Sequence, residues 1–271
     1  MEWPKLKNIV LIILALTNLF LFIFVAGRDL QNSDYQRKAR SDAIQFLVDR
    51  GITVTESQVP HKMDLAPQTV ERDLEQEGAL AAQLLNGSVQ VEARGGEVYR
   101  YFNENGSIQF HSDGAFAATF ASGVFQVGED REKDCLALLT KLNFEGKLIE
   151  KQTDSLTVQQ LWNGVPLFTQ QVTLELRDNC VTSMTAGRRL VGQPVPDTAR
   201  KTVTVATAMI EFFNSVNALG DVCSRVDSIT QGYASSIALS GPMTLTPVWR
   251  IVTDTGAYQL DLVTGTLTRE A

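Results

Sequence analysis

The residues that could carry chemistry are few and scattered along the chain. The only histidines are His61 and His111, and neither has other ligands at metal-binding spacing. The sequence has no Gly-x-Ser-x-Gly elbow, no phosphate-binding GxxxxGK loop and no GxGxxG dinucleotide motif. We therefore predict no catalytic residue, no metal site and no cofactor, and a protein that is not an enzyme. An exported enzyme whose site is assembled from distant residues is the alternative.

The cysteines and the acidic cluster have structural explanations. Cys135, Cys180 and Cys223 form no Cys-x-x-Cys pair, and three small buried apolar residues account for them best. A Cys180–Cys223 disulfide stays open at this stage. The acidic run at residues 129–132 is typical of a helix N-terminus, where carboxylates meet the positive end of the helix dipole.

Composition indicates a globular, acidic protein. Of the 271 residues, 44% are hydrophobic and 20% are charged, and the formal net charge is −7. Charges of both signs are spread along the chain, as on an ordinary folded surface. Nucleic-acid binding is disfavoured, because phosphate contacts need clustered lysine and arginine.

The N-terminal region predicts a membrane anchor. Residues 9–27 contain no charged side chain, and 19 residues at ~1.5 Å each span roughly the thickness of a bilayer core. A cleaved signal peptide is the main alternative, but its apolar stretch is typically shorter. We predict a single-pass protein of the cell membrane, with a cytoplasmic N-terminus and an extracellular C-terminal domain. More basic residues follow this stretch than precede it, which opposes this orientation because basic residues are usually cytoplasmic. A long domain, however, crosses the membrane largely regardless of its charge, so the orientation remains possible.

Two polar residues interrupt this apolar stretch, Thr17 and Asn18. An amide is costly in an apolar environment, and such residues usually face another helix and hydrogen-bond to it. Thr17 and Asn18 are therefore the predicted partner-binding residues.

The hydrophobic pattern divides the chain into five parts. These are a cytoplasmic tail (1–8), a transmembrane helix (9–27), a helical stalk (28–50), an N-terminal α+β part (51–128) and a second α+β part (129–271) with a linker near residues 192–197.

Local signals predict the elements of the two α+β parts. A short strand is expected at residues 52–59, and Pro67 is expected to open a helix that ends at Asn86. Asp130 starts a second helix, and a third is expected over residues 198–216. After each of the last two helices, strands separated by Asn-Gly and Thr-Gly turns predict an antiparallel meander. The predicted fold class is α+β, with a transmembrane helix followed by repeated helix-plus-meander units.

Three stretches of this sequence resemble the YycI family. They are the opening at residues 1–9, the segment Leu161-Trp162-Asn163-Gly164-Val165-Pro166-Leu167-Phe168, and the segment from Leu245 to Gly256 with Tyr258 and Thr264-Gly265 beyond it. The second and third are similar to the family's NG-x-P hairpin and its P-x-WR strand pair. Residues 60–127 contain no stretch that matches, and Pro4 departs from the family pattern.

The resemblance implies a function and partners. YycI-like proteins act with a YycH-like protein on a sensor histidine kinase of the WalK/YycG type, which governs cell-wall metabolism. The chain would then be a membrane-anchored extracytoplasmic regulator that works by protein–protein contact, including contact through its transmembrane helix. The alternative is a PepSY-like binding or inhibitory module for a peptidase or a small ligand, because its repeated helix-plus-meander units resemble that class.

Overall fold

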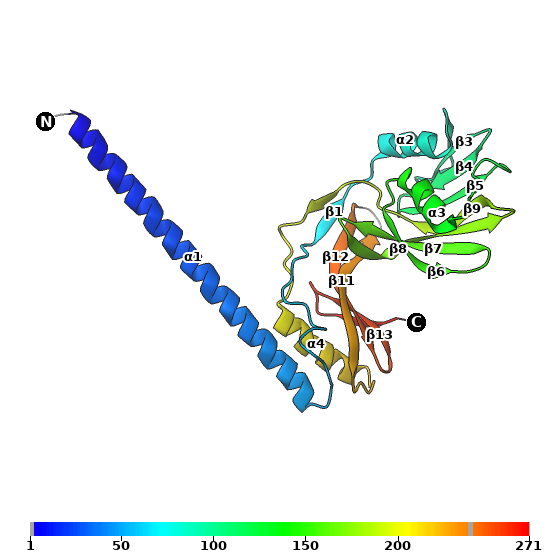
Figure 1. The fold of residues 1–271 in the computed structure, drawn as a ribbon. Helices are drawn as coiled ribbons and strands as arrows, with labels where there is room; N and C mark the ends of the chain where they lie inside the picture. The colour runs from blue at the N-terminus through cyan, green and yellow to red at the C-terminus, as the bar shows by residue number, and fades with distance from the viewer. Residues whose placement is uncertain (1–2, 238–240, 271) are drawn as a thin grey trace.

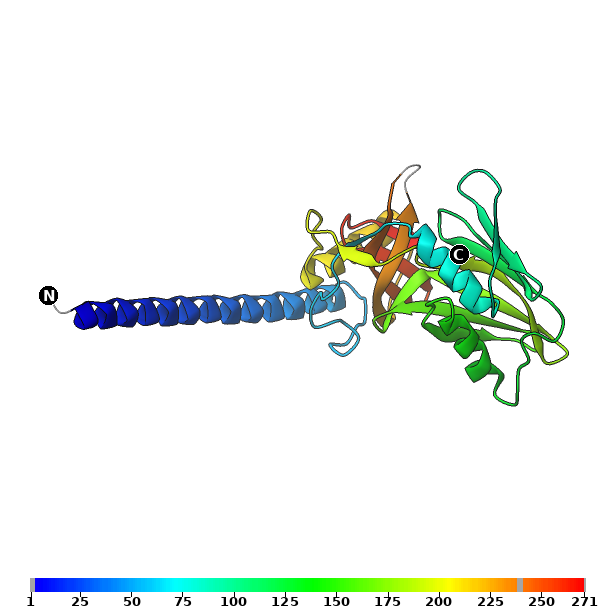
Figure 2. The ribbon, with the colours of Figure 1, turned by 90° about the horizontal axis from the view of Figure 1, so that it is seen from above.

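A long helix projects from a mainly β body. The computed structural model describes the backbone of residues 3–237 and 241–270, and the side chains of these except 3–10, 12 and 23–32. Helix α1 (Trp3–Asp49) contains 47 residues and reaches the body only with its C-terminal end (Figure 1). Seen from above, it runs straight away from the body (Figure 2).

The prediction of a transmembrane helix over residues 9–27 is wrong. In the part of the chain that the structure describes, no helix contains a stretch both long and apolar enough to cross a membrane. Residues 9–27 form no separate helix either, because the helical hydrogen bonding continues past Gly27 through the predicted stalk. The side chains of residues 9, 10, 12 and 23–27 lie outside the described ones. The predictions of a single-pass topology and of a location in the cell membrane depended on this helix, and they are therefore wrong as well.

The first of three helix-plus-meander units covers residues 74–120. Helix α2 (Leu74–Leu84) begins where the Asp73 carboxylate accepts a hydrogen bond from the Gln76 N–H, which satisfies one of the unpaired amides at a helix start. Its antiparallel strands are β2 (Gln90–Ala93), β3 (Tyr99–Asn103), β4 (Gly106–Phe110) and β5 (Ala115–Phe120).

The second unit covers residues 131–188 and repeats this order. Helix α3 (Arg131–Thr140) is capped by Asp130, whose carboxylate accepts a hydrogen bond from Lys133 N–H. Asn163 and Gly164 both have positive φ, at 51° and 76°, as a two-residue hairpin turn with the twist of the flanking strands requires. The strands are β6 (Gly146–Lys151), β7 (Ser155–Trp162), β8 (Val165–Arg177) and β9 (Cys180–Arg188).

The third unit covers residues 205–269. Helix α4 (Val205–Ala218) starts after Thr204, whose hydroxyl accepts a hydrogen bond from Thr207 N–H. The chain then runs through four antiparallel strands, β11 (Val226–Ile237), β12 (Met243–Thr253), β13 (Gly256–Asp261) and β14 (Leu267–Arg269). Two short strands, β1 (Gln68–Val70) and β10 (Pro194–Pro196), extend the edge of β12.

In the described part of the chain, the three meanders together with β1 and β10 form one 14-stranded sheet. The first and second units join through their last strands, β5 and β9. Strand β8 is long enough to pair β9 along its C-terminal half and to meet β11 in parallel at Leu167, opposite Tyr233. The structure is thus mixed α/β and mostly one large sheet. The predicted fold class, α+β with a transmembrane helix followed by repeated helix-plus-meander units, is therefore wrong.

Three buried clusters hold the body together. One lies between α2, α3 and the strands of the first two units, and includes the fully buried Phe144 and Leu139. Another lies between the end of α1, α4 and the third unit, around Trp249 and Tyr258. A small cluster around Leu167 and Tyr233 connects them. The end of α1 therefore packs against the last unit in sequence, not against the unit that follows it along the chain.

Some local predictions were also wrong. Residues 52–59 form only an isolated bridge at Thr53. Pro67 precedes strand β1 rather than opening a helix, and α2 begins seven residues later, at Leu74. The predicted helix over 198–216 begins at Val205 and extends to Ala218.

Candidate functional site

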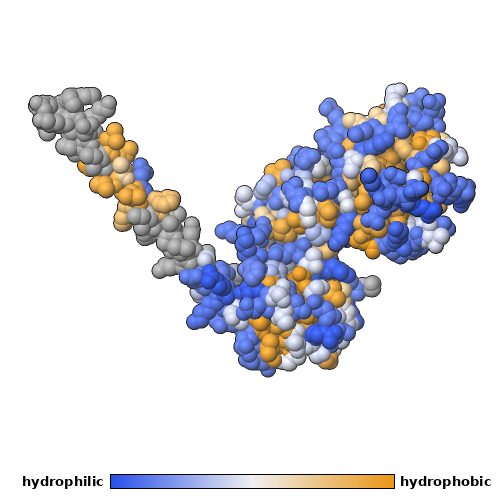
Figure 3. Space-filling view, in the orientation of Figure 1, coloured by the Kyte–Doolittle hydropathy of each residue, from blue (hydrophilic) through white to orange (hydrophobic). Residues whose placement is uncertain are grey.

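The projecting part of α1 carries a band of exposed apolar side chains, which we call the apolar segment (residues 11–22). The large apolar side chains that the structure describes there are between 51% and 72% exposed. They are Leu11, Ile13, Leu14, Leu16, Leu19, Phe20, Leu21 and Phe22. Figure 3 shows them as an orange band well away from the body. Exposed apolar surface of this extent typically marks an interaction site.

The C-terminal end of α1 positions this segment. Ala43, Ile44 and Leu47 are at most 8% exposed in the cluster around Trp249. The Phe46 ring meets the Phe213 ring of α4 edge-on, with the centroids 5.3 Å apart. These contacts fix the direction in which α1 leaves the body.

Arg40 holds the same end of the helix to the following loop. Its guanidinium is buried and donates hydrogen bonds to the carbonyl oxygens of Pro60 (3.1 Å), Val59 (2.9 Å) and Glu56. A buried arginine is tolerated when its donors are paired in this way. Loop residues 51–60 are thus clamped between α1 and the third unit.

The two predicted partner-binding residues differ in their hydrogen bonding. Thr17 Oγ1 donates to the carbonyl oxygen of Ile13 at 2.9 Å, one turn earlier in the helix. Asn18 is exposed, and within the described part of the chain its amide makes no hydrogen bond. Both lie in the apolar segment, but only Asn18 offers an unpaired donor and acceptor there.

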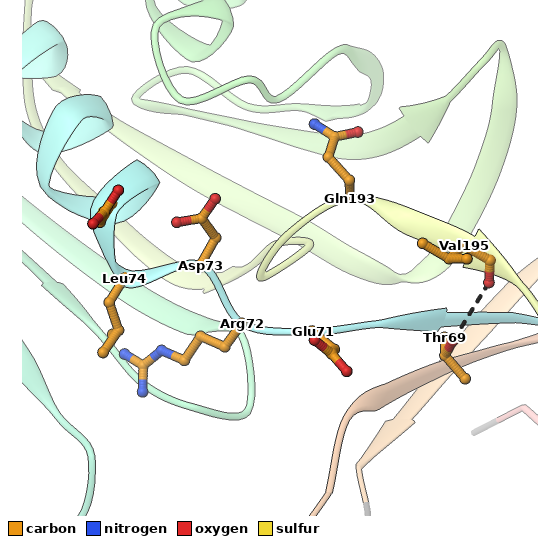
Figure 4. A pocket seen from close by; sticks show the side chains of 8 residues that line it. Thr69, Glu71, Arg72, Asp73, Leu74, Gln193 and Val195 are labelled. Carbon is orange, nitrogen blue, oxygen red and sulfur yellow. Dashed lines mark hydrogen bonds between the residues drawn. The ribbon is translucent and has the colours of Figure 1, made fainter.

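A polar groove is lined by residues of β1, the start of α2 and β10. Its volume is about 700 Å³. The Thr69 hydroxyl in its lining donates to the carbonyl oxygen of Val195 on the paired strand at 3.4 Å (Figure 4). The lining is mostly polar and consists of Thr69, Glu71, Arg72, Asp73, Leu74, Glu75, Gln193 and Val195. Pockets for small ligands are usually lined mostly by apolar side chains, and here only Leu74 and Val195 are apolar.

A buried ion cluster lies beside this groove. Arg72 donates to both Glu77 carboxylate oxygens, at 3.0 and 2.9 Å, and Arg189 Nη2 lies 3.7 Å from the same carboxylate. The Arg189 guanidinium sits 4.6 Å from the centroid of the Phe110 ring. Burial lowers the pKa of Arg189 to about 10, although Glu77 opposes the shift. The cluster ties α2 to the end of β9, so its role is structural.

The histidines and cysteines form no reactive group. His111 Nε2 lies 2.8 Å from the Gln109 side-chain nitrogen, and His61 is exposed. Among the described residues, no group of three or more His, Cys, Asp or Glu side chains could hold a metal ion. Cys135, Cys180 and Cys223 are all free thiols. Burial, and secondarily Asp134, raises the pKa of Cys135 to about 11, which disfavours the reactive thiolate.

The sequence alone did not reveal the groove or the ion cluster. Both join segments that are distant along the chain, and Glu77 and Arg189 are separated by most of two units. Gln160, which belongs to neither, is a buried polar residue at an inward position in the alternating pattern of β7. Its buried amide accepts a hydrogen bond from the Leu190 N–H at 3.1 Å.

Comparisons with known proteins leave the family open. No protein-family model matches the chain, and no curated protein is similar to it. Among solved structures, an uncharacterised protein from Eubacterium rectale is 10% identical, with a TM-score of 0.39, and the match covers 77% of this chain and 82% of that one. The Bacillus megaterium YpeB C-terminal domain is 13% identical, with a TM-score of 0.38, and the match covers 74% and 99%. At these TM-scores neither likeness supports an inference about function, and neither structure is described as a YycI protein.

Proposed function

We propose that this chain is a non-catalytic binding protein that works by protein–protein contact, with the apolar segment of α1 as its docking element. The observation that carries the proposal is the exposure of the large apolar side chains at residues 11–22. Burying one leucine side chain completely stabilises a complex by about 1.5–3 kcal/mol. A few such residues are sufficient for a specific interface, because hot spots supply most of the binding energy.

The resemblance to YycI suggests which partner to test first. It points to a sensor histidine kinase of the WalK/YycG type together with a YycH-like protein. A binding protein without an active site can regulate a kinase if it binds one of the kinase's conformations more tightly than the other. A difference of about 1.4 kcal/mol in binding free energy changes the ratio of the two conformations tenfold.

A second candidate function uses the body instead of the helix. The groove lined by β1, the start of α2 and β10 is large enough for a small ligand or a peptide, as a PepSY-like binding module would require. Its mostly polar lining with only two apolar side chains favours a weaker, polar contact. The apolar segment is therefore the stronger candidate.

Three matched double variants of the full chain distinguish these functions. Leu16→Gln/Leu19→Gln changes the apolar segment, Glu75→Gln/Val195→Gln changes the groove, and Val91→Gln/Ile149→Gln changes two exposed apolar residues elsewhere on the body, 61% and 48% exposed. Each variant is cross-linked and co-purified with a purified WalK/YycG-type kinase and a YycH-like protein, in parallel with the unchanged chain.

We expect only the apolar-segment variant to lose its partner, by at least tenfold in the captured fraction. If only the groove variant loses it, the second candidate replaces the proposal. Flotation with protein-free vesicles of phosphatidylethanolamine and phosphatidylglycerol provides a further arm. Binding to such vesicles without capture of any protein would overturn the proposal that the segment docks on a protein.

A further inference from the structure

The apolar segment contains a regular stripe with a single amide in it. Leu11, Leu14, Asn18 and Leu21 follow one another in steps of three, four and three residues. This is the spacing of the a and d positions in a coiled coil, with Leu11 and Asn18 at a and Leu14 and Leu21 at d. The three leucines are 58%, 63% and 51% exposed.

Helix geometry separates this stripe from the rest of the segment. At about 100° per residue, the four positions fall within one narrow stripe of the helix surface. Leu16 lies about 200° beyond Leu14 and about 200° before Asn18, and therefore faces the opposite direction. Thus the segment has a seam that contains Asn18 and a back that contains Leu16.

Asn18 indicates what covers the seam. An asparagine side chain has both donor and acceptor groups, and burial without a hydrogen bond is costly. Two asparagines facing each other satisfy this requirement mutually. One asparagine at an a position is known to fix register and oligomeric state in parallel two-stranded coiled coils.

We infer that the seam of the apolar segment pairs with the seam of a second copy of this chain, parallel and in register, so that Asn18 faces Asn18. In a parallel, in-register pair, the second copy places its own Asn18 at the same position along the helix. Each amide then faces an identical amide, as expected for a two-fold interface. The inference rests on the proposed function, because both use the apolar segment. The back of the helix, with Ile13 and Leu16, faces away from this pairing.

Cysteine cross-linking of the full chain tests the geometry. In mild detergent under oxidising conditions, Leu14→Cys is compared with Leu16→Cys, and the unchanged chain reports the background from the three native cysteines. We expect Leu14→Cys to form a dimeric disulfide at least tenfold faster than Leu16→Cys. Equal rates at both positions would indicate non-specific apolar association and would overturn the inference.

A second variant tests the amide itself. Asn18→Leu removes the polar residue that limits the assembly to two strands, so we expect its mass in analytical ultracentrifugation to rise from two copies to a mixture of larger oligomers. An unchanged chain that is monomeric across the accessible concentration range would overturn the inference.

The two proposals fail in different ways. If no copy-to-copy disulfide forms but Leu16→Gln/Leu19→Gln still abolishes capture of the kinase or the YycH-like protein, the second-copy inference is wrong and the docking element stands. If the disulfide forms at residue 14 and no other protein is captured through the segment, the second copy is itself the partner. Absence of both results removes both proposals.

Discussion

The two ends of α1 both carry large apolar side chains, but these are buried at the C-terminal end and exposed in the apolar segment. At the C-terminal end, Ala43, Ile44 and Leu47 are 4%, 8% and 1% exposed. In the apolar segment, Leu14 and Phe20 are 63% and 68% exposed. Both stretches form helix, so helix formation does not distinguish them. The difference lies in what covers the side chains, because the chain supplies its own cover at one end and not at the other.

The polar residues Arg40 and Asn18, one at each end of α1, differ in burial and hydrogen bonding in the same way. Arg40 is buried, and its donors are paired with carbonyl oxygens of the loop at residues 56–60. Asn18 is exposed, and in the described chain its amide makes no hydrogen bond. A polar group beside apolar side chains is stable when its partner is fixed. The chain provides that partner for Arg40 and provides none for Asn18 among the described residues.

Truncation of a leucine at each end should give the largest contrast. We expect Leu47→Ala to lower the free energy of unfolding by about 3 kcal/mol, because it leaves a cavity in the cluster around Trp249. Leu19→Ala should change it by less than about 0.5 kcal/mol, because Leu19 is already 55% exposed. Urea unfolding followed by tryptophan fluorescence measures both, since Trp249 is fully buried in the same cluster as Leu47.

Equal effects at the two leucines would contradict this contrast. A loss of 2 kcal/mol or more for Leu19→Ala would mean that the apolar segment is already covered in the purified protein. The same measurement at several protein concentrations would then show whether self-association provides the cover, because the stability of an oligomer depends on concentration.

The arginines give the next largest effect. We expect Arg40→Met to lower the free energy of unfolding by about 2 kcal/mol, because it keeps most of the apolar stem but leaves buried carbonyl oxygens unpaired. Arg37→Met is the matched control on the projecting side. The Arg37 side chain is 75% exposed and pairs with Asp34 at 3.3 Å, so its loss should cost less than about 0.5 kcal/mol. A similar cost for both would mean that Arg40 does not clamp the loop.

Local signals in the sequence predicted the β7–β8 turn and the start of α3 correctly. Asn163-Gly164 forms the β7–β8 turn with both residues at positive φ, and Asp130 caps α3, as expected from residue type alone. Both depend on a few neighbouring residues. The same kind of reasoning failed at Pro67, because the pairing of β1 with β12 and β10 lies far away in sequence and outweighs the local helix signal.

The candidate site was predictable only in part. The apolar stretch and its two polar residues, Thr17 and Asn18, are visible in the sequence. The prediction of a transmembrane helix from this stretch was wrong, because hydropathy measures how apolar the side chains are and not which surface they contact. The burial of Arg40 could not be predicted, since its acceptors lie on a loop some twenty residues later. The docking of α1 on the third unit depends on contacts across most of the chain.

The aromatic contact between α1 and α4 should give the smallest effect and sharpens the comparison further. Phe46 and Phe213 meet edge-on, and the Arg50 guanidinium lies 5.2 and 5.7 Å from their ring centroids. A double-mutant cycle with Phe46→Leu and Phe213→Leu, read by urea unfolding, should give a coupling energy of about 1 kcal/mol, as for other aromatic pairs. A coupling energy near zero would mean that each ring contributes independently by its own burial. The direction of α1 would then depend on Arg40 and Leu47 and not on this pair, so the cycle measures how specifically the body aims the apolar segment.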